Sequence, residues 1–152
     1  MMQQLLLPAR ALRVCIIGCS DAKNDTQQAA ETLYRSQLFA NSRRYASSAA
    51  FDRWFIVSAR YGLVEPSQII APYDMKLKSA DAGQWAHNVV SRLRHELQAP
   101  AEVTIIAGAL YADPIADCIE ARRRENDRAW VAVRRPLAGL GIGKRLQFLA
   151  VA

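Results

Sequence analysis

The sequence of 152 residues predicts an α/β fold: a single three-layer domain with a four-stranded, mainly parallel sheet flanked by helices. Two observations support this prediction. Four short apolar runs have the length and composition of buried strands, and segments with helical periodicity separate them. Strands that alternate with helices favour a parallel sheet with right-handed crossovers. We expect the domain over residues 13–152, preceded by an N-terminal extension over residues 1–12.

The expected strands are short and rich in aliphatic side chains, and glycine lies at or just beyond each of their ends. Such runs are typical of strands that are buried on both faces of a parallel sheet. The four strands are expected at Arg13–Gly18, Trp54–Ala59, Val103–Ala107 and Trp130–Val133.

Helical periodicity and capping residues place the helices. Ser36 has the side chain of an N-cap, and Pro114 stands where a first-turn proline would begin a helix. The segment Arg60–Lys78 contains a glycine and two prolines and is too long for an ordinary connection, so we expect a structured, functional loop there. The helices are expected at Gln27–Tyr34, Ser36–Ala50, Ala80–Leu97, Pro114–Arg124 and Ile142–Val151.

Composition limits the class of protein and its partners. The net charge of +6 favours a polyanionic partner, either a nucleic acid or a phosphorylated small molecule. No apolar run approaches the roughly 20 residues of a membrane span. In the run Leu5–Leu7 the basic residues follow the leucines, which is the wrong order for a signal peptide. We therefore expect a cytoplasmic protein that does not associate with membranes.

Three cysteines, Cys15, Cys19 and Cys118, form an odd and sparse set, which indicates reduced thiols rather than disulfides. Cys15 and Cys19 have no second pair and no nearby histidine, so a zinc site is not expected. We expect neither a metal nor a cofactor. The sequence leaves the oligomeric state open.

The most informative stretch is the glycine-rich loop that follows the fourth strand. Gly139, Gly141 and Gly143 alternate just before Lys144 and the last helix. A bare backbone ahead of a helix N-terminus favours an anion such as phosphate or carboxylate, and we expect either a positive φ or a tight backbone approach at Gly141. The loop lacks the glycine and hydroxyl of a Walker A motif and the spacing of a dinucleotide fingerprint. The alternative is a tight strand-to-helix turn that binds nothing.

Polar and glycine residues follow the other three strands as well. Ligands of parallel sheets bind beyond the carboxyl ends of the strands, so we expect these residues to line one site. They are Gly18, Cys19 and Ser20 after the first strand, Ser58, Arg60 and Tyr61 around the end of the second, and Gly108 and Tyr111 after the third.

Three residues at this edge are candidates for catalysis. Cys19 would be a nucleophile if a cation such as Lys23 activates it, although neither histidine of the chain is placed to serve as its base. Asp74, in the long loop, is the leading candidate for a general base, and Asp21 follows it. The alternative for Asp74 is an Asx turn that closes the loop.

Other residues at the same edge are candidates for binding. Ser20 and Lys23, with Arg60 and Lys144, would hold the anion. The rings of Tyr61, Tyr73 and Tyr111 would flank a nucleobase or, alternatively, roof the core.

Several motifs resemble those of a family of small bacterial and phage proteins classed as a domain of unknown function. Its patterns are G-C-S-x-x-K, W-F-I-L-S-A-K-Y-G-L, P-Y-D and P-L-x-G-L-G-I-G-K. The resemblance covers nearly the whole chain, and Arg60 takes the place of the usual lysine. It implies a conserved type of site without naming a reaction. The matching segments are Gly18–Lys23, Trp54–Leu63, Pro72–Asp74 and Pro136–Lys144.

A weaker resemblance, at the level of fold alone, is to the uracil-DNA glycosylase architecture. That architecture also has a four-stranded parallel sheet, with a catalytic loop after the first strand and a Pro-Leu loop after the last. Pro136–Leu137 falls at the analogous place, but the catalytic Asp and His of that group have no secure match here.

These observations predict an α/β enzyme that acts on a nucleotide, a nucleoside or a nucleic-acid base, at the glycosidic or the phosphate linkage. The alternative is a non-catalytic nucleic-acid-binding protein of phage or mobile-element defence. Asp74→Asn separates the two hypotheses, because an enzyme would lose turnover and keep binding, whereas a binder has no turnover to lose.

Overall fold

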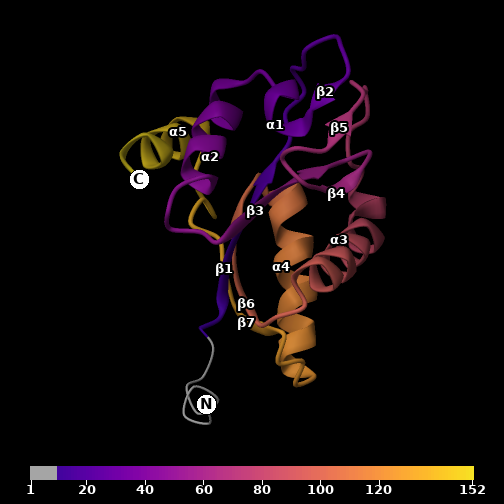
Figure 1. Ribbon diagram of the computed structural model, residues 1–152, viewed down its shortest axis with the longest axis vertical. Coiled ribbons are helices and arrows are strands. Elements are labelled where there is room, and N and C mark those ends of the chain that lie inside the picture. Colours follow the sequence, from indigo (N-terminus) through magenta and orange to yellow (C-terminus); the bar gives the residue numbers. More distant parts are fainter. Residues whose placement is uncertain (1–9) are drawn as a thin grey trace, which may run out of the picture.

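The computed structural model describes residues 10–152 and shows a mixed α/β fold built on a five-stranded, mostly parallel sheet (Figure 1). The strand order is β4-β3-β1-β6-β7. Four strands run parallel, at the places where the sequence predicted strands. They are β1 (Leu12–Gly18), β3 (Arg53–Ser58), β6 (Ala101–Ile106) and β7 (Trp130–Arg134).

The sheet has one strand more than the four that the sequence predicted. The fifth strand, β4 (Gly62–Val64), lies in the segment expected to be a loop and pairs antiparallel with β3. Gly62 has a φ of +70°, which allows the tight reversal between the two strands. Because β4 has only three residues and follows this turn directly, its apolar pattern is too short to stand out in the sequence.

Strand β1 lies at the centre of the sheet and separates two hydrophobic clusters. Val14 and Ile16 pack into one cluster and Cys15 and Ile17 into the other, and all four side chains are fully buried. Alternate side chains of a strand point to opposite faces, so these four consecutive positions of β1 have to be apolar.

Helices cover both faces of the sheet (Figure 1). Helices α3 (Ala82–Leu97) and α4 (Ala109–Arg124) pack with the Val14 side of the sheet, and α3 buries the apolar residues that recur along its sequence. Helices α2 (Gln37–Ala46) and α5 (Ile142–Val151) pack with the Cys15 side. A single 3₁₀ turn, η2 (Ser79–Asp81), leads into α3.

Two helices in the N-terminal half of the chain are shorter than the helices predicted from the sequence. In the segment Gln27–Tyr34 only α1 (Ala30–Leu33) is helical, because Gln28–Ala29 forms β2 and pairs antiparallel with β5 (Ile69–Ile70). The helix predicted to run to Ala50 ends at Ala46. Long-range pairing of β2, which local periodicity does not report, therefore replaced the first turn of the expected helix.

The helix predicted to begin at Pro114 begins instead at Ala109, so the proline lies inside α4. A proline has no backbone N–H. The carbonyl of Leu110 therefore receives no helical hydrogen bond from position 114, in the second turn of the helix. Burial of Ala112, Ile115 and Ile119 against the sheet stabilises the helix on both sides of the proline.

The predicted N-terminal extension, residues 1–12, lies almost wholly outside the described residues, and its last residue, Leu12, is the first of β1. Within the described part of the chain, no helix has the length and apolar content needed to cross a bilayer.

The backbone of the glycine-rich loop differs from the prediction at Gly141. Its φ is −72°, and it is the N-cap of α5, so the expectation of a positive φ there is wrong. Gly139 instead has a φ of +78°. The chain reverses three residues before α5 begins, and the left-handed conformation falls at that reversal.

We expect Gly139→Ser to lower the free energy of unfolding by about 1–2 kcal/mol, because an L-residue is strained at positive φ. Gly141→Ser is the matched control. Serine is a good N-cap, and a Cβ at Gly141 meets no atom within 4 Å, so this variant should be as stable as the parent. Urea unfolding of both variants measures the difference, and equal stabilities would contradict the assignment.

Candidate functional site

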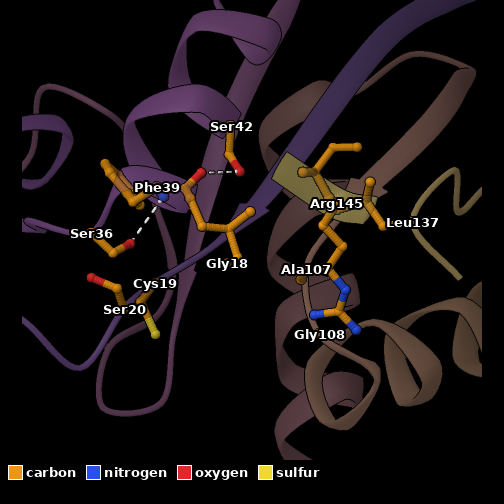
Figure 2. A pocket seen from close by; sticks show the side chains of 12 residues that line it. Gly18, Cys19, Ser20, Ser36, Phe39, Ser42, Ala107, Gly108, Leu137 and Arg145 are labelled. Atoms are coloured by element: carbon orange, nitrogen blue, oxygen red, sulfur yellow. Dashed lines mark hydrogen bonds between the residues drawn. The ribbon is translucent and has the colours of Figure 1, made fainter. Parts of the chain in front are cut away.

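A pocket of about 80 Å³ lies at the carboxyl edge of the sheet, where β1 and β6 end (Figure 2). The ends of the two strands contribute Gly18 and Ala107 to its wall. A Cβ on Gly18 would lie 3.1 Å from the Cβ of Ala107, so a larger residue would crowd the two strand ends. The glycine that closes the first strand thus permits the close approach that shapes the pocket.

Helix α2 forms the second wall with Ser36, Phe39 and Ser42. Ser36 Oγ accepts a hydrogen bond from the Phe39 amide at 3.0 Å, and this is the N-cap predicted from the sequence. Ser42 Oγ donates to the Leu38 carbonyl at 2.7 Å. The hydrogen of the Ser36 hydroxyl and the lone pairs of Ser42 therefore remain for a ligand.

Arg145 of α5 completes the pocket and also lines a second one of about 240 Å³ beside it. Its Nε donates to the Leu140 carbonyl at 2.8 Å, which holds the side chain across the loop. A Cβ on Gly108 would lie 3.5 Å from Arg145 Nη1, so the guanidinium lies against the bare backbone where α4 begins. In the second pocket, Arg135 pairs with Asp113.

Beside the first pocket, three hydroxyl groups form a connected cluster. Ser58 Oγ donates to Tyr73 Oη at 2.8 Å, and the Tyr34 and Tyr73 hydroxyls are 2.8 Å apart. Burial raises the pKa of Tyr34 to about 12 and raises that of Tyr73 further above its ordinary value. Both phenols therefore keep their protons at neutral pH and serve as hydrogen-bond partners rather than as bases.

Cys19 connects the first pocket with the aromatic residues next to it. Its Sγ is 3.9 Å from Tyr111 Oη, and the Tyr111 ring packs edge-on against Trp85 at 5.2 Å. Burial, and then the neighbouring Cys19, raise the pKa of Tyr111, so its phenol also stays protonated. Cys15 is buried in the core, and none of the three cysteines forms a disulfide.

The structure brings together about half of the predicted site residues. Gly18, Cys19, Ser20 and Gly108 line the first pocket, and Gly139 lines the second.

Other predicted residues lie in the adjacent cluster. Ser58 and Tyr73 belong to it, Tyr111 lies 3.9 Å from Cys19 Sγ, and Lys23 Nζ lies 4.4 Å from the centre of the Tyr73 ring. Lys23 also donates to the Asp21 carbonyl at 3.1 Å.

The remaining predicted residues lie away from both pockets. Asp74 is exposed, and Asp21 is exposed and pairs with Lys76 at 3.8 Å. Three residues at the start of α5 are exposed and line neither pocket: Gly141, Gly143 and Lys144. Two further residues, Arg60 and Tyr61, line a separate recess against α3.

Several pocket residues were not predicted. Ser36 was predicted as a helix cap and Phe39 as a residue of the same helix, and Arg145 stands where a Walker A motif has its hydroxyl residue, but none of the three was predicted as a site residue. Ser42 was not singled out. Because α2 follows no strand end, its place at this edge depends on packing that the local sequence does not encode. Within residues 10–152, no group of three or more His, Cys, Asp or Glu side chains is placed to hold a metal ion.

A sequence model of the family of unknown function DUF6884 matches residues 14–151. The chain belongs to DUF6884. The match to this family includes the whole sheet except the first residues of β1, and it includes both pockets. The resemblance to a domain of unknown function is therefore confirmed, whereas the likeness to uracil-DNA glycosylases stays a prediction. No curated protein matches the chain in sequence.

Proposed function

We propose that this protein binds a nucleoside or nucleotide at the carboxyl edge of the sheet and cleaves its glycosidic or phosphate linkage. The observation that carries the proposal is the position of Arg145, which borders both pockets and faces the bare start of α4. One pocket is partly apolar, and the other contains Arg145, Gly139 and the Arg135–Asp113 ion pair among apolar residues. This pairing suits a ligand with a flat ring at one end and a phosphate at the other.

The first pocket would hold the base. Phe39 and Leu137 supply apolar surface, and their side chains are 3% exposed. Ser36 Oγ accepts and Ser42 Oγ donates in the hydrogen bonds drawn in Figure 2, which leaves the Ser36 hydroxyl hydrogen and the Ser42 lone pairs for a ligand. One donor and one acceptor on the same wall match the amide-like edge of a nucleobase.

The phosphate would lie between Arg145 and the first turn of α4. Gly108, the N-cap of this 16-residue helix, has no side chain to satisfy the first amides. Those amides and the guanidinium together favour an anion, and the net charge of +6 favours its approach. In this proposal Arg145 takes the role that the sequence assigned to its neighbour Lys144.

Cys19 would carry the reaction. It is the one candidate catalytic residue that lines the first pocket, and no Asp, Glu or His lies among the lining residues. Attack by its sulfur on the anomeric carbon or on phosphorus would form the bond to sulfur as the bond to the leaving group breaks, and the leaving group would depart with the proton of the thiol; water would then cleave the bond to sulfur and restore the thiol. The Cys19 thiol donates to Tyr111 Oη at 3.9 Å, so the protonated Tyr111 phenol would stand beside the sulfur that reacts.

Isothermal titration with a panel of nucleosides and nucleoside monophosphates tests the binding part. Arg145→Met should weaken binding of the monophosphates by about 1.5–3 kcal/mol, the usual value of hydrogen bonds to a charged group. Lys144→Met removes one positive charge from the preceding residue of the same helix and should bind like the parent. Equal affinities of the two variants, or no binding by the parent, would contradict the proposal.

The alternative, a nucleic-acid-binding protein without catalysis, is favoured by one observation. The lining of the first pocket contains no carboxylate or imidazole that could serve as a general base. Turnover by the parent and its loss on substitution of Cys19 separate the two functions.

A further inference from the structure

A recess of about 350 Å³ lies between β4 and α3, which are neighbours in Figure 1. It shares no lining residue with the two pockets at the sheet edge. Two arginines, Arg60 and Arg92, and two aromatic residues, Tyr61 and Trp85, line it together with Asn88. We call this recess the α3 groove. Its lining combines positive charge with flat apolar rings.

Only one of the two arginines of the α3 groove, Arg92, has a carboxylate partner among the described residues. Among the described residues, no carboxylate lies within salt-bridge distance of Arg60, whose guanidinium carbon is 5.4 Å from the centre of the Tyr61 ring. Arg92 pairs with Glu96 at 3.2 Å, but its side chain is 54% exposed and keeps donors for a second partner. The α3 groove therefore presents two cations to solvent.

Packed aromatic rings connect the α3 groove with the site at the sheet edge. The Tyr61 ring packs edge-on against Tyr73 at 5.5 Å, and Tyr73 belongs to the hydroxyl cluster. By a second route, Trp85 packs against Tyr111, which is 3.9 Å from Cys19 Sγ. Arg60 and Tyr61 follow the carboxyl end of β3, the parallel neighbour of β1, so the α3 groove begins at the same edge of the sheet as the first pocket, although α3 and α2 cover opposite faces.

We propose that the α3 groove binds the chain of a single-stranded nucleic acid whose reactive nucleotide occupies the pockets at the sheet edge. Single-strand sites combine cations along the backbone path with aromatic rings on which bases stack. An acidic peptide would pair with the arginines and would make no use of the aromatic surface that Tyr61 and Trp85 contribute to the groove. A duplex keeps its bases stacked inside, so the rings would have no base to contact. The inference rests on the proposed function, because it names a polymer as the substrate of the same site.

Fluorescence anisotropy with a labelled oligothymidylate of about 16 nucleotides, titrated at several salt concentrations, tests the proposal. The test variant is Arg60→Gln with Arg92→Gln, which removes both groove cations. The matched control is Arg124→Gln with Arg128→Gln, which removes two exposed arginines that line a different recess beyond the far end of α4. A duplex of matched length and a polyglutamate competitor complete the set.

The proposal predicts that the parent prefers the single strand to the duplex and that polyglutamate does not displace the oligonucleotide. The test variant should bind the oligonucleotide about tenfold more weakly than the parent. The slope of log affinity against log salt concentration should also be smaller in magnitude by about 1.4, because each phosphate contact with a single strand contributes about 0.7. The control should keep most of the parent slope. Equal losses in both variants, a preference for duplex or displacement by polyglutamate would overturn the proposal.

The two proposals fail separately. Binding of nucleoside monophosphates that depends on Arg145, together with oligonucleotide binding that does not depend on the groove arginines, would overturn the polymer inference alone. Absence of any binding that depends on Arg145 would overturn the proposed function, whatever the oligonucleotide result.

Discussion

Replacement of Cys19 by alanine is expected to abolish turnover and to leave nucleotide binding intact. The thiol lines the first pocket, and no other nucleophile candidate of the sequence prediction does so. Loss of a nucleophile lowers kcat by about a thousandfold or more in enzymes that form a covalent intermediate. The expected result is a Kd close to that of the parent in titration calorimetry, with product formation at background in a chromatographic assay.

Asp74→Asn is the control for this prediction. Its carboxylate is exposed and lies outside both pockets, so the amide should leave turnover nearly unchanged. The opposite pattern, with Asp74→Asn inactive and Cys19→Ala active, would reinstate the general base predicted from the sequence. Absence of turnover in the parent with every nucleoside and nucleotide tested would favour the non-catalytic alternative.

Phe55→Ala is expected to have the largest effect on stability. Phe55 lies on β3, opposite Ile16 of the central strand, and its side chain is fully buried in the cluster with Leu93. Truncation of a buried phenylalanine leaves a cavity that the packed core fills only in part, and costs about 3–5 kcal/mol. Urea unfolding followed by far-UV circular dichroism gives the difference in free energy.

Ile69→Ala is the matched control, because Ile69 also lies on a strand but is 59% exposed. Its loss should change the free energy of unfolding by no more than about 0.5 kcal/mol. Similar losses in the two variants would mean that β3 does not lie in the core as described.

The parallel part of the fold could be predicted because each strand is a continuous apolar run. β1 needs apolar side chains on both faces, and the sequence Val14–Ile17 shows this without long-range information. Short elements could not be predicted in this way. β4 pairs with β3 across a tight turn, β2 pairs with β5 from a distant part of the sequence, and the two or three residues of each strand carry no periodicity.

The site could be predicted only where it coincides with strand ends. Gly18, Cys19 and Gly108 were found because each directly follows an apolar run. Arg145 and Phe39 come from helices, and which face of a helix meets the sheet edge depends on packing that local sequence does not encode. Lys144 and Arg145 illustrate the limit, because they are adjacent on α5 and only Arg145 lines the pockets. Which of the two cations does so depends on how α5 is rotated about its own axis.

A crystal structure of the Cys19→Ala variant with a bound nucleoside monophosphate tests the central claim most directly. We predict the base in the first pocket against Phe39, and the phosphate within hydrogen-bond distance of Arg145 and the amides at the start of α4. A phosphate bound by Lys144 instead, with the pocket between Phe39 and Arg145 unoccupied, would contradict the proposed site.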